Sequence, residues 1–153
     1  MNEPSVQYGQ ADTSFRAAGG EDGIRQLVDR FYARMGSDKR FERIFRLHPA
    51  AIDTSVDKLA RFLNGWLGGP RSYQATYGSL SIPLAHQHLP VDQDLHDQWL
   101  TCMAESVDEQ PFPLSFKAYL MAQLRVPAAA ILKRCTETGG TRQTKAPFGV
   151  RQP

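Results

Sequence analysis

The chain has 153 residues, of which 41% are hydrophobic, and this length is enough for one domain with a proper core but not for two. Its 18 Lys and Arg residues and 16 Asp and Glu residues give a formal charge of +2. Five of the basic residues and one acid, Glu137, lie from Lys133 onward, so the rest of the chain has a net charge of −2. Because the basic excess belongs to the C-terminal end, the charge indicates neither a nucleic acid nor a membrane surface as partner.

The first strongly periodic stretch follows the pair Gly19 and Gly20, after residues 1–14, which we expect to form a flexible N-terminal segment. Its apolar residues recur at helical spacing, and Gly36 is expected to end the helix. These apolar residues are Ile24, Leu27, Val28, Phe31, Tyr32 and Met35. A shorter helical stretch covers roughly residues 40–47 and ends before Pro49.

The second long helix is predicted to run from Asp53 or Thr54, either of which could cap it, to Leu67. The sequence Gly-Gly-Pro at residues 68–70 ends it. Residues 71–91 are less regular, because one glycine and two prolines limit any helix there to one or two turns.

Regular periodicity returns over residues 93–108, and a last helix is predicted to start near Pro113 and to be kinked or divided at Pro127. Residues 136–153 have adjacent glycines, two prolines and no apolar period, so we expect a disordered tail. No segment combines period-two alternation with a hairpin signal. The predicted fold class is therefore all-α, with one domain over residues 15–135.

Several classes of protein are excluded by what the chain lacks. Cys102 and Cys135 have neither the density nor the spacing of a disulfide framework or a zinc site. The first ten residues resemble no signal peptide, and no apolar run approaches the length of a membrane span. We expect a soluble, reduced protein of the cytoplasm.

The candidate metal ligands are four histidines: His48, His86, His88 and His96. His86 and His88 are two residues apart, a spacing at which helical side chains do not face each other. Prolines on both sides argue against a strand, which would place both on one face. We therefore expect at most one of the two to bind a given centre. The alternative is that both are partly exposed histidines of a loop.

Signals for other chemistry are weak. The chain has no G-x-S-x-G elbow, no phosphate-binding G-x-x-x-x-G-K and no carboxylates spaced as an acid and base pair, so no catalytic residue is assigned. Tyr32 and Trp99 differ from ordinary core residues in one respect, because a buried phenol or indole needs a hydrogen-bond partner.

Three segments in the same order resemble the truncated haemoglobins of the second group. They are GG…LVDRFY over residues 19–32, FLNGWLGGP over 62–70, and DQWLTCM over 97–103. The similarity covers about residues 15–135. It implies a shortened globin fold in which helices are sandwiched around one haem b (iron protoporphyrin IX).

The resemblance also implies roles for individual residues. His86 matches the iron-binding histidine without a gap when counted from Gly78 or from Trp99, whereas His88 requires a two-residue shift and stays open as an alternative ligand. The residues that match the distal, ligand-binding side are Tyr32, His48, Ser55 and Trp99. The residues expected around the haem are Lys58, Leu59, Phe62, Leu89, Val91, Trp99 and Met103, with Lys58 at the position that pairs with a propionate.

The segment next to His86 departs from the group. Ala85 stands where the group commonly has a basic residue, His88 where it often has proline, and Leu89 where it often has an aromatic residue. We therefore expect this segment to be looser or differently angled.

The resemblance implies reversible binding of dioxygen, and of other small ligands such as NO or CO, at a five-coordinate iron. Tyr32, His48 and Trp99 can each donate a hydrogen bond, and two or three such bonds would slow oxygen release by one to several powers of ten, since roughly 1.4 kcal/mol is a tenfold change. Slow release suits tight oxygen holding, or redox chemistry with nitric oxide or peroxide, better than bulk delivery. The function that the resemblance implies is oxygen binding, carriage or detoxification. One alternative is a haem peroxidase or nitric-oxide dioxygenase that depends on an external reductase, and a second is a haem-free helical interaction module. A homodimer is left open.

Overall fold

The computed structural model describes residues 7–138, and within this range every regular element is a helix, so the predicted all-α class is confirmed. In chain order the elements are α1 (Thr13–Ala17), α2 (Gly20–Ser37), a 3-10 turn (Lys39–Phe41), α3 (Glu42–Phe45), α4 (Ile52–Trp66), α5 (Ser72–Tyr77), α6 (Ile82–His86), α7 (Gln93–Asp108) and α8 (Leu114–Glu137). None of these helices combines the length and the apolar character that crossing a bilayer requires.

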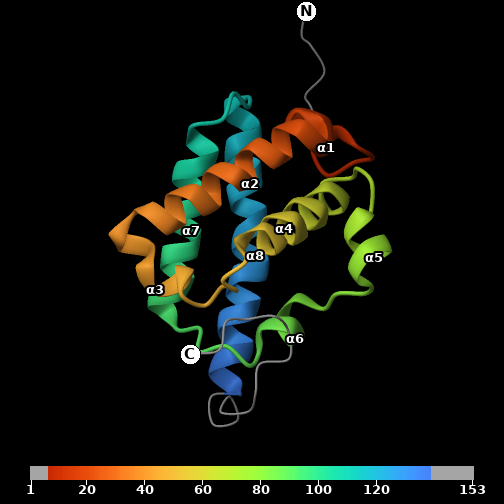
Figure 1. Ribbon diagram of the computed structural model, residues 1–153. Helices are drawn as coiled ribbons and strands as arrows, with labels where there is room; N and C mark the ends of the chain where they lie inside the picture. Colours follow the sequence, from red (N-terminus) through yellow and green to blue (C-terminus); the bar gives the residue numbers. More distant parts are fainter. Residues whose placement is uncertain (1–6, 139–153) are drawn as a thin grey trace, which may run out of the picture.

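The four long helices form two crossed layers: α2 and α4 make up one layer, and α7 and α8 run side by side in the layer behind it (Figure 1). α2 packs against both α4 and α7. The short helices α5 and α6 lie along the chain between α4 and α7, and α6 contacts the far end of α8 (Figure 1). This arrangement leaves α6 outside the packed centre of the molecule.

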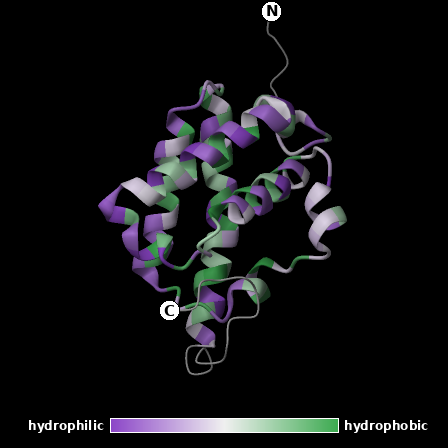
Figure 2. Cartoon of the chain, viewed as in Figure 1, coloured by the Kyte–Doolittle hydropathy of each residue, from purple (hydrophilic) through white to green (hydrophobic). Residues whose placement is uncertain are grey.

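The core contains the apolar face that the periodicity predicts for α2. α2 buries the six predicted residues of its apolar stripe, which are Ile24, Leu27, Val28, Phe31, Tyr32 and Met35. Hydrophilic residues predominate along the outward side of the same helix (Figure 2). Burial of apolar side chains is the main source of stability in such a fold, so α2, α4, α7 and α8 support one another.

The cap predicted for α4 is wrong, and of the two outcomes predicted for Pro127, a kink or a division of the last helix, the division is excluded. α4 begins one residue before Asp53, and no side chain caps it, because Asp53 and Thr54 both lie inside its first turn. α8 is not divided at Pro127, although proline cannot donate a hydrogen bond to the preceding turn. Buried side chains before and after Pro127 stabilise both halves of α8; they are Phe116, Leu120, Leu124 and Cys135.

Helix α1 is absent from the sequence-based prediction, and long-range contacts explain its position. The backbone N–H of Phe15 donates to the carbonyl of Leu67, 2.9 Å away, at the end of α4. A Cβ atom on Gly68 would lie 2.0 Å from the carbonyl oxygen of Ala11, and Gly68 has a φ of +98°. The Gly-Gly-Pro sequence therefore also makes room for α1.

The two ends of the described chain differ in part from the expected boundaries. The ring of Tyr8, within the segment expected to be flexible, packs 5.4 Å from that of Phe116, and its hydroxyl hydrogen-bonds Ser115 at 2.7 Å. α8 continues two residues past the expected domain end at Cys135. The rest of the expected segments, residues 1–6 and 139–153, lies outside the described residues.

Candidate functional site

His86 is the last residue of α6, and its imidazole is anchored by its own helix. The ring Nδ1 lies 2.7 Å from the carbonyl oxygen of Ile82, one turn earlier. Because a carbonyl only accepts, Nδ1 must carry the proton in this hydrogen bond. The neutral ring then keeps the lone pair on Nε2, which is the form in which histidine binds a metal.

The surroundings of His86 favour this neutral form. Burial lowers the pKa of the His86 imidazole, and the hydrogen bond to Ile82 opposes the shift only in part. Burial also lowers the pKa of His88, with the proximity of His86 as a second cause. His88 is half-buried and lies in the turn after α6, whereas His86 is part of the helix.

Tyr32 and Trp99, the two predicted donors, come from α2 and α7 and meet through one core residue. The ring of Phe31 lies 5.0 Å from that of Tyr32 and 5.2 Å from that of Trp99, with edge-to-face geometry in both cases. Phe31 is fully buried, whereas Trp99 is half-buried. Such pairs have a preferred orientation, so Phe31 restricts both side chains.

His48 joins this group from the loop before α4. Its ring lies 5.4 Å from the Tyr32 ring, and its Nδ1 lies 3.0 Å from the carbonyl oxygen of Ile44. Burial raises the pKa of the Tyr32 phenol, and the nearby Cys102 thiol contributes to the shift. Tyr32 therefore stays protonated at neutral pH and keeps its O–H as a donor.

The four expected site residues of α4 share one half-buried side of the helix: Ser55, Lys58, Leu59 and Phe62. Leu59 and Phe62 pack against the core. The Phe62 ring stacks on that of Trp66, with centroids 5.9 Å apart. The Lys58 ammonium lies 5.3 Å from the ring centroid of Tyr77 on α5, a cation–π contact.

The remaining expected residues are not equivalent. Met103 on α7 is fully buried in the core, and Val91 packs against the core from the loop before α7. Leu89 is half-buried, and its backbone N–H donates to the carbonyl of His86 at 2.9 Å. Leu89 is thus tied to the backbone of the predicted ligand.

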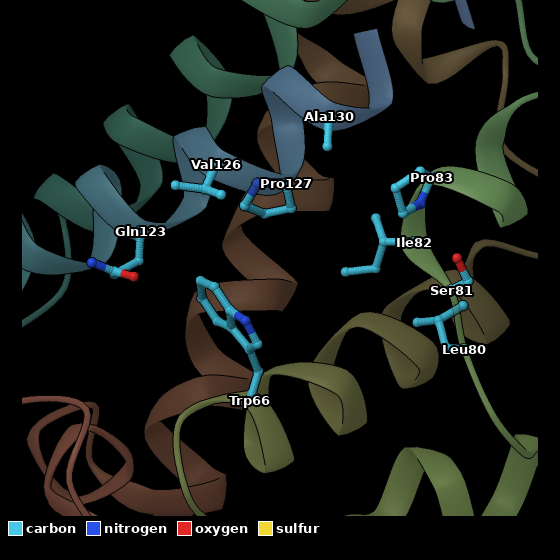
Figure 3. A pocket seen from close by; sticks show the side chains of 9 residues that line it. All are labelled: Trp66, Leu80, Ser81, Ile82, Pro83, Gln123, Val126, Pro127 and Ala130. Atoms are coloured by element: carbon cyan, nitrogen blue, oxygen red, sulfur yellow. The ribbon is translucent and has the colours of Figure 1, made fainter. Parts of the chain in front are cut away.

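An open pocket of about 580 Å³ lies beside these residues, between the end of α4, α6 and the middle of α8 (Figure 3). Trp66, Ile82 and Pro127 are among its lining residues, and none of the predicted site residues lines it. Trp66 is one turn beyond Phe62, and Ile82 is one turn before His86. The pocket is therefore adjacent to the predicted site but is not the site itself, because no predicted site residue lines it.

Ion pairs across the surface tie α2 to α7, the two helices that carry the predicted donors. Arg30 and Arg34 of α2 both pair with Glu109, and Arg34 also pairs with Glu105 at 3.1 Å. The hydrogen bond from Arg30 and then that from Arg34 lower the pKa of Glu109 to about 2. Exposed pairs contribute little individually, but a shared network also restricts the register of two helices.

Sequence reasoning missed the backbone partner of His86. The carbonyl of Ile82 is four residues before the ring, and this spacing is visible only once residues 82–86 are known to be helical. The prolines in this stretch had limited the expectation to an irregular segment. It also missed the contacts that α8 makes after residue 133.

Comparisons with known proteins add an independent finding. Residues 13–129 match a family described as bacterial-like globin. The chain is 30% identical over 120 residues, 78% of its length and 89% of the relative's, to the group 2 truncated hemoglobin YjbI of Bacillus subtilis.

Solved structures agree with that match. The group II 2-on-2 hemoglobin from Agrobacterium tumefaciens is 27% identical, has a TM-score of 0.75, and covers 86% of this chain and 97% of its own. A cold-adapted truncated hemoglobin from the Antarctic bacterium Pseudoalteromonas haloplanktis is 29% identical, with a TM-score of 0.75 and a coverage of 78% and 96%. The shortened arrangement of helices is therefore shared with solved proteins.

Proposed function

Because this chain belongs to the bacterial-like globin family, among the group II truncated haemoglobins, we propose that it holds one haem b through His86 and binds dioxygen reversibly, with NO and CO as further ligands. Haem is the cofactor of this family, and its members bind diatomic molecules. The ligand residue, the type of haem and the physiological role are the proposed part.

The observation that carries the proposal is the hydrogen bond from His86 Nδ1 to the carbonyl of Ile82. It leaves Nε2 as the metal-binding nitrogen of a neutral imidazole. When bound, a haem would supply an iron that needs one protein ligand and keeps one position for a small molecule. The residues present fit this demand, because the hydrogen bond to Ile82 leaves the half-buried His86 ring one free nitrogen with a lone pair.

Tyr32 and Trp99 are proposed to donate hydrogen bonds to the diatomic ligand, with His48 and Ser55 beside them. His48 would donate to the ligand only when its ring is doubly protonated, because the proton on its Nδ1 is directed to the carbonyl of Ile44. Support comes from the protonated state of Tyr32 and from its contact with the His48 ring. Each such bond contributes about 1 kcal/mol net, and more where the ligand gains charge. Strong donors favour oxygen storage or detoxification over bulk delivery.

The apolar surroundings of the haem are proposed to come from α4, the segment after α6, and α7. The residues are Leu59, Phe62, Leu89, Val91, Trp99 and Met103. Lys58 is proposed to pair with a propionate, for which its ammonium would leave the Tyr77 ring. An exposed ion pair and an exposed cation–π contact each contribute at most about 1 kcal/mol, so the exchange would cost little.

A titration of the purified chain with hemin tests the proposal. We expect a strong Soret band at one hemin per chain in the wild type and its loss in His86→Ala. His88→Ala is the matched control, because it removes an imidazole two residues away, and it should keep the band. A wild-type chain that refuses hemin would contradict the haem assignment, and loss of the band in His88→Ala alone would transfer it to His88.

A further inference from the structure

The helix that carries His86 is too short to hold its own position. α6 has five residues and buries none of its side chains. An isolated helix of this length is unstable in water, and the last carbonyls of any helix lack partners within it. The orientation of the His86 ring must therefore depend on contacts from elsewhere in the fold.

The last turn of α8 and the residue that follows it, Thr138, supply these contacts. The Cys135 thiol donates to the carbonyl oxygen of His86 at 3.2 Å, and the Thr138 hydroxyl donates to the carbonyl oxygen of Gln87 at 3.1 Å. The Arg134 guanidinium donates to the side-chain oxygen of Gln87 at 2.9 Å. Three donors from five consecutive residues thus meet two consecutive residues at the end of α6.

The geometry places these donors together. Arg134 lies in the last turn of α8, and Thr138 is the residue that follows the helix. The backbone N–H of Thr138 donates to the carbonyl of Arg134 at 3.0 Å, so the chain keeps the two residues one turn apart. Cys135 is fully buried, so its thiol meets the His86 carbonyl in a position that solvent does not reach. The Thr138 hydroxyl also lies 2.9 Å from the carbonyl oxygen of Arg134. Its single proton is therefore shared between the carbonyls of Gln87 and Arg134.

We propose that Cys135 and Thr138 are positioning residues for the haem ligand, an inference that rests on the proposed function. The His86 ring is held at Nδ1 by the carbonyl one turn before it, and its backbone is held at the carbonyl by α8. These two attachments define the direction of Nε2. We call Arg134, Cys135 and Thr138, with their hydrogen bonds to residues 86 and 87, the clamp. The clamp holds α6 in place of the buried side chains that this helix lacks.

The test uses the full chain and compares two variants of the clamp, one that removes the Thr138 hydroxyl and one that removes the Cys135 thiol. Thr138→Val should speed hemin transfer to an excess of apomyoglobin about fivefold, the factor expected for one neutral hydrogen bond. Cys135→Ala should have a smaller effect, about twofold, because a thiol is a weak donor. Both should shift or broaden the iron–histidine stretching band in the resonance Raman spectrum of the ferrous protein.

Two variants serve as controls. Thr136→Val removes a comparable bond within α8, from Thr136 Oγ1 to the carbonyl of Leu132 at 2.8 Å, without touching α6. Thr138→Ser keeps the donor, so it should restore the wild-type band position. A Raman band and a hemin loss rate unchanged in both Thr138→Val and Cys135→Ala would overturn the inference while leaving the proposed function intact. An equal effect of Thr136→Val would also overturn it.

Amide hydrogen exchange separates the clamp from the cofactor. The Leu89 N–H donates to the same His86 carbonyl, so it reports on this turn with or without hemin. If the chain fails to bind hemin, the proposed function fails, and faster exchange of Leu89 in Thr138→Val would still support the clamp. Unchanged exchange in that variant would count against it.

Discussion

The two sides of the proposed haem site are built in different ways. The proposed donors Tyr32 and Trp99 lie on helices of 18 and 16 residues, which bury six and five side chains in the common core. The proposed ligand His86 lies on a helix of five residues that buries none, and α5 before it also buries none. The distal side is therefore positioned by packing and the proximal side by hydrogen bonds to backbone carbonyls. Substitutions on the two sides should have different consequences.

The largest effect on stability is expected from Phe31→Ala. Phe31 is fully buried and contacts both Tyr32 and Trp99, so its removal leaves a cavity in the distal side. The free energy of unfolding, measured in urea, should fall by about 3–5 kcal/mol. Leu84→Ala on α6 is the comparison, because Leu84 is 49% exposed, and it should change the value by less than about 0.5 kcal/mol. Equal losses would contradict the contrast between the two sides.

Removal of a distal donor should affect ligand release more than stability. Tyr32→Phe and Trp99→Phe should each raise the oxygen dissociation rate about fivefold, which corresponds to about 1 kcal/mol of lost hydrogen bonding. Stopped-flow measurement on the ferrous protein checks this. Tyr73→Phe removes the phenol of a half-buried tyrosine on α5 and should leave the rate unchanged. Rates that stay at the wild-type value in both distal variants would remove the donor assignment.

A smaller, pH-dependent effect is expected where α7 begins. Asp92 caps α7 through the Leu95 N–H at 3.0 Å and pairs with Arg43 at 2.8 Å. The Arg43 hydrogen bond, followed by the cap, lowers the pKa of Asp92 from 3.8 to about 2. Because the folded pKa is the lower one, the stabilisation is present above pH 3.8 and is lost as the pH falls toward 2.

Asp92→Ala should therefore cost about 1 kcal/mol of unfolding free energy at pH 7. The difference in unfolding free energy between Asp92→Ala and the wild type should shrink as the pH falls from 3.8 toward 2. Asp92→Asn keeps an acceptor for the cap and should retain part of the stability. A cost that is independent of pH would show that the charge of Asp92 is not involved.

The same contrast explains what could be predicted from the sequence. α7 matches its predicted range because a helical pattern and a local cap both mark it, and the buried stripe of α2 follows from spacing alone. These features depend on neighbours in the chain. Core packing of this kind leaves a periodic trace that sequence reasoning can use.

Elements that are held by contacts distant in the chain left no such trace, and the proximal side is one of them. The position of α1 depends on Leu67 and Gly68, and that of α6 depends on Cys135 and Thr138, all distant in the chain. Residues 136–138 were interpreted as the start of a tail, because their composition says nothing about a contact with residue 87. The choice of His86 over His88 likewise came from resemblance to a family and not from periodicity.

The most direct test of the central claim is chemical replacement of the proposed iron ligand. His86→Gly leaves space for a free imidazole at the position of the removed side chain. With hemin and dithionite, this variant should lack the iron–histidine Raman band and should regain an iron–imidazole band when imidazole is added. An iron–histidine band that persists in His86→Gly without imidazole would show that another residue binds the iron and would contradict the account.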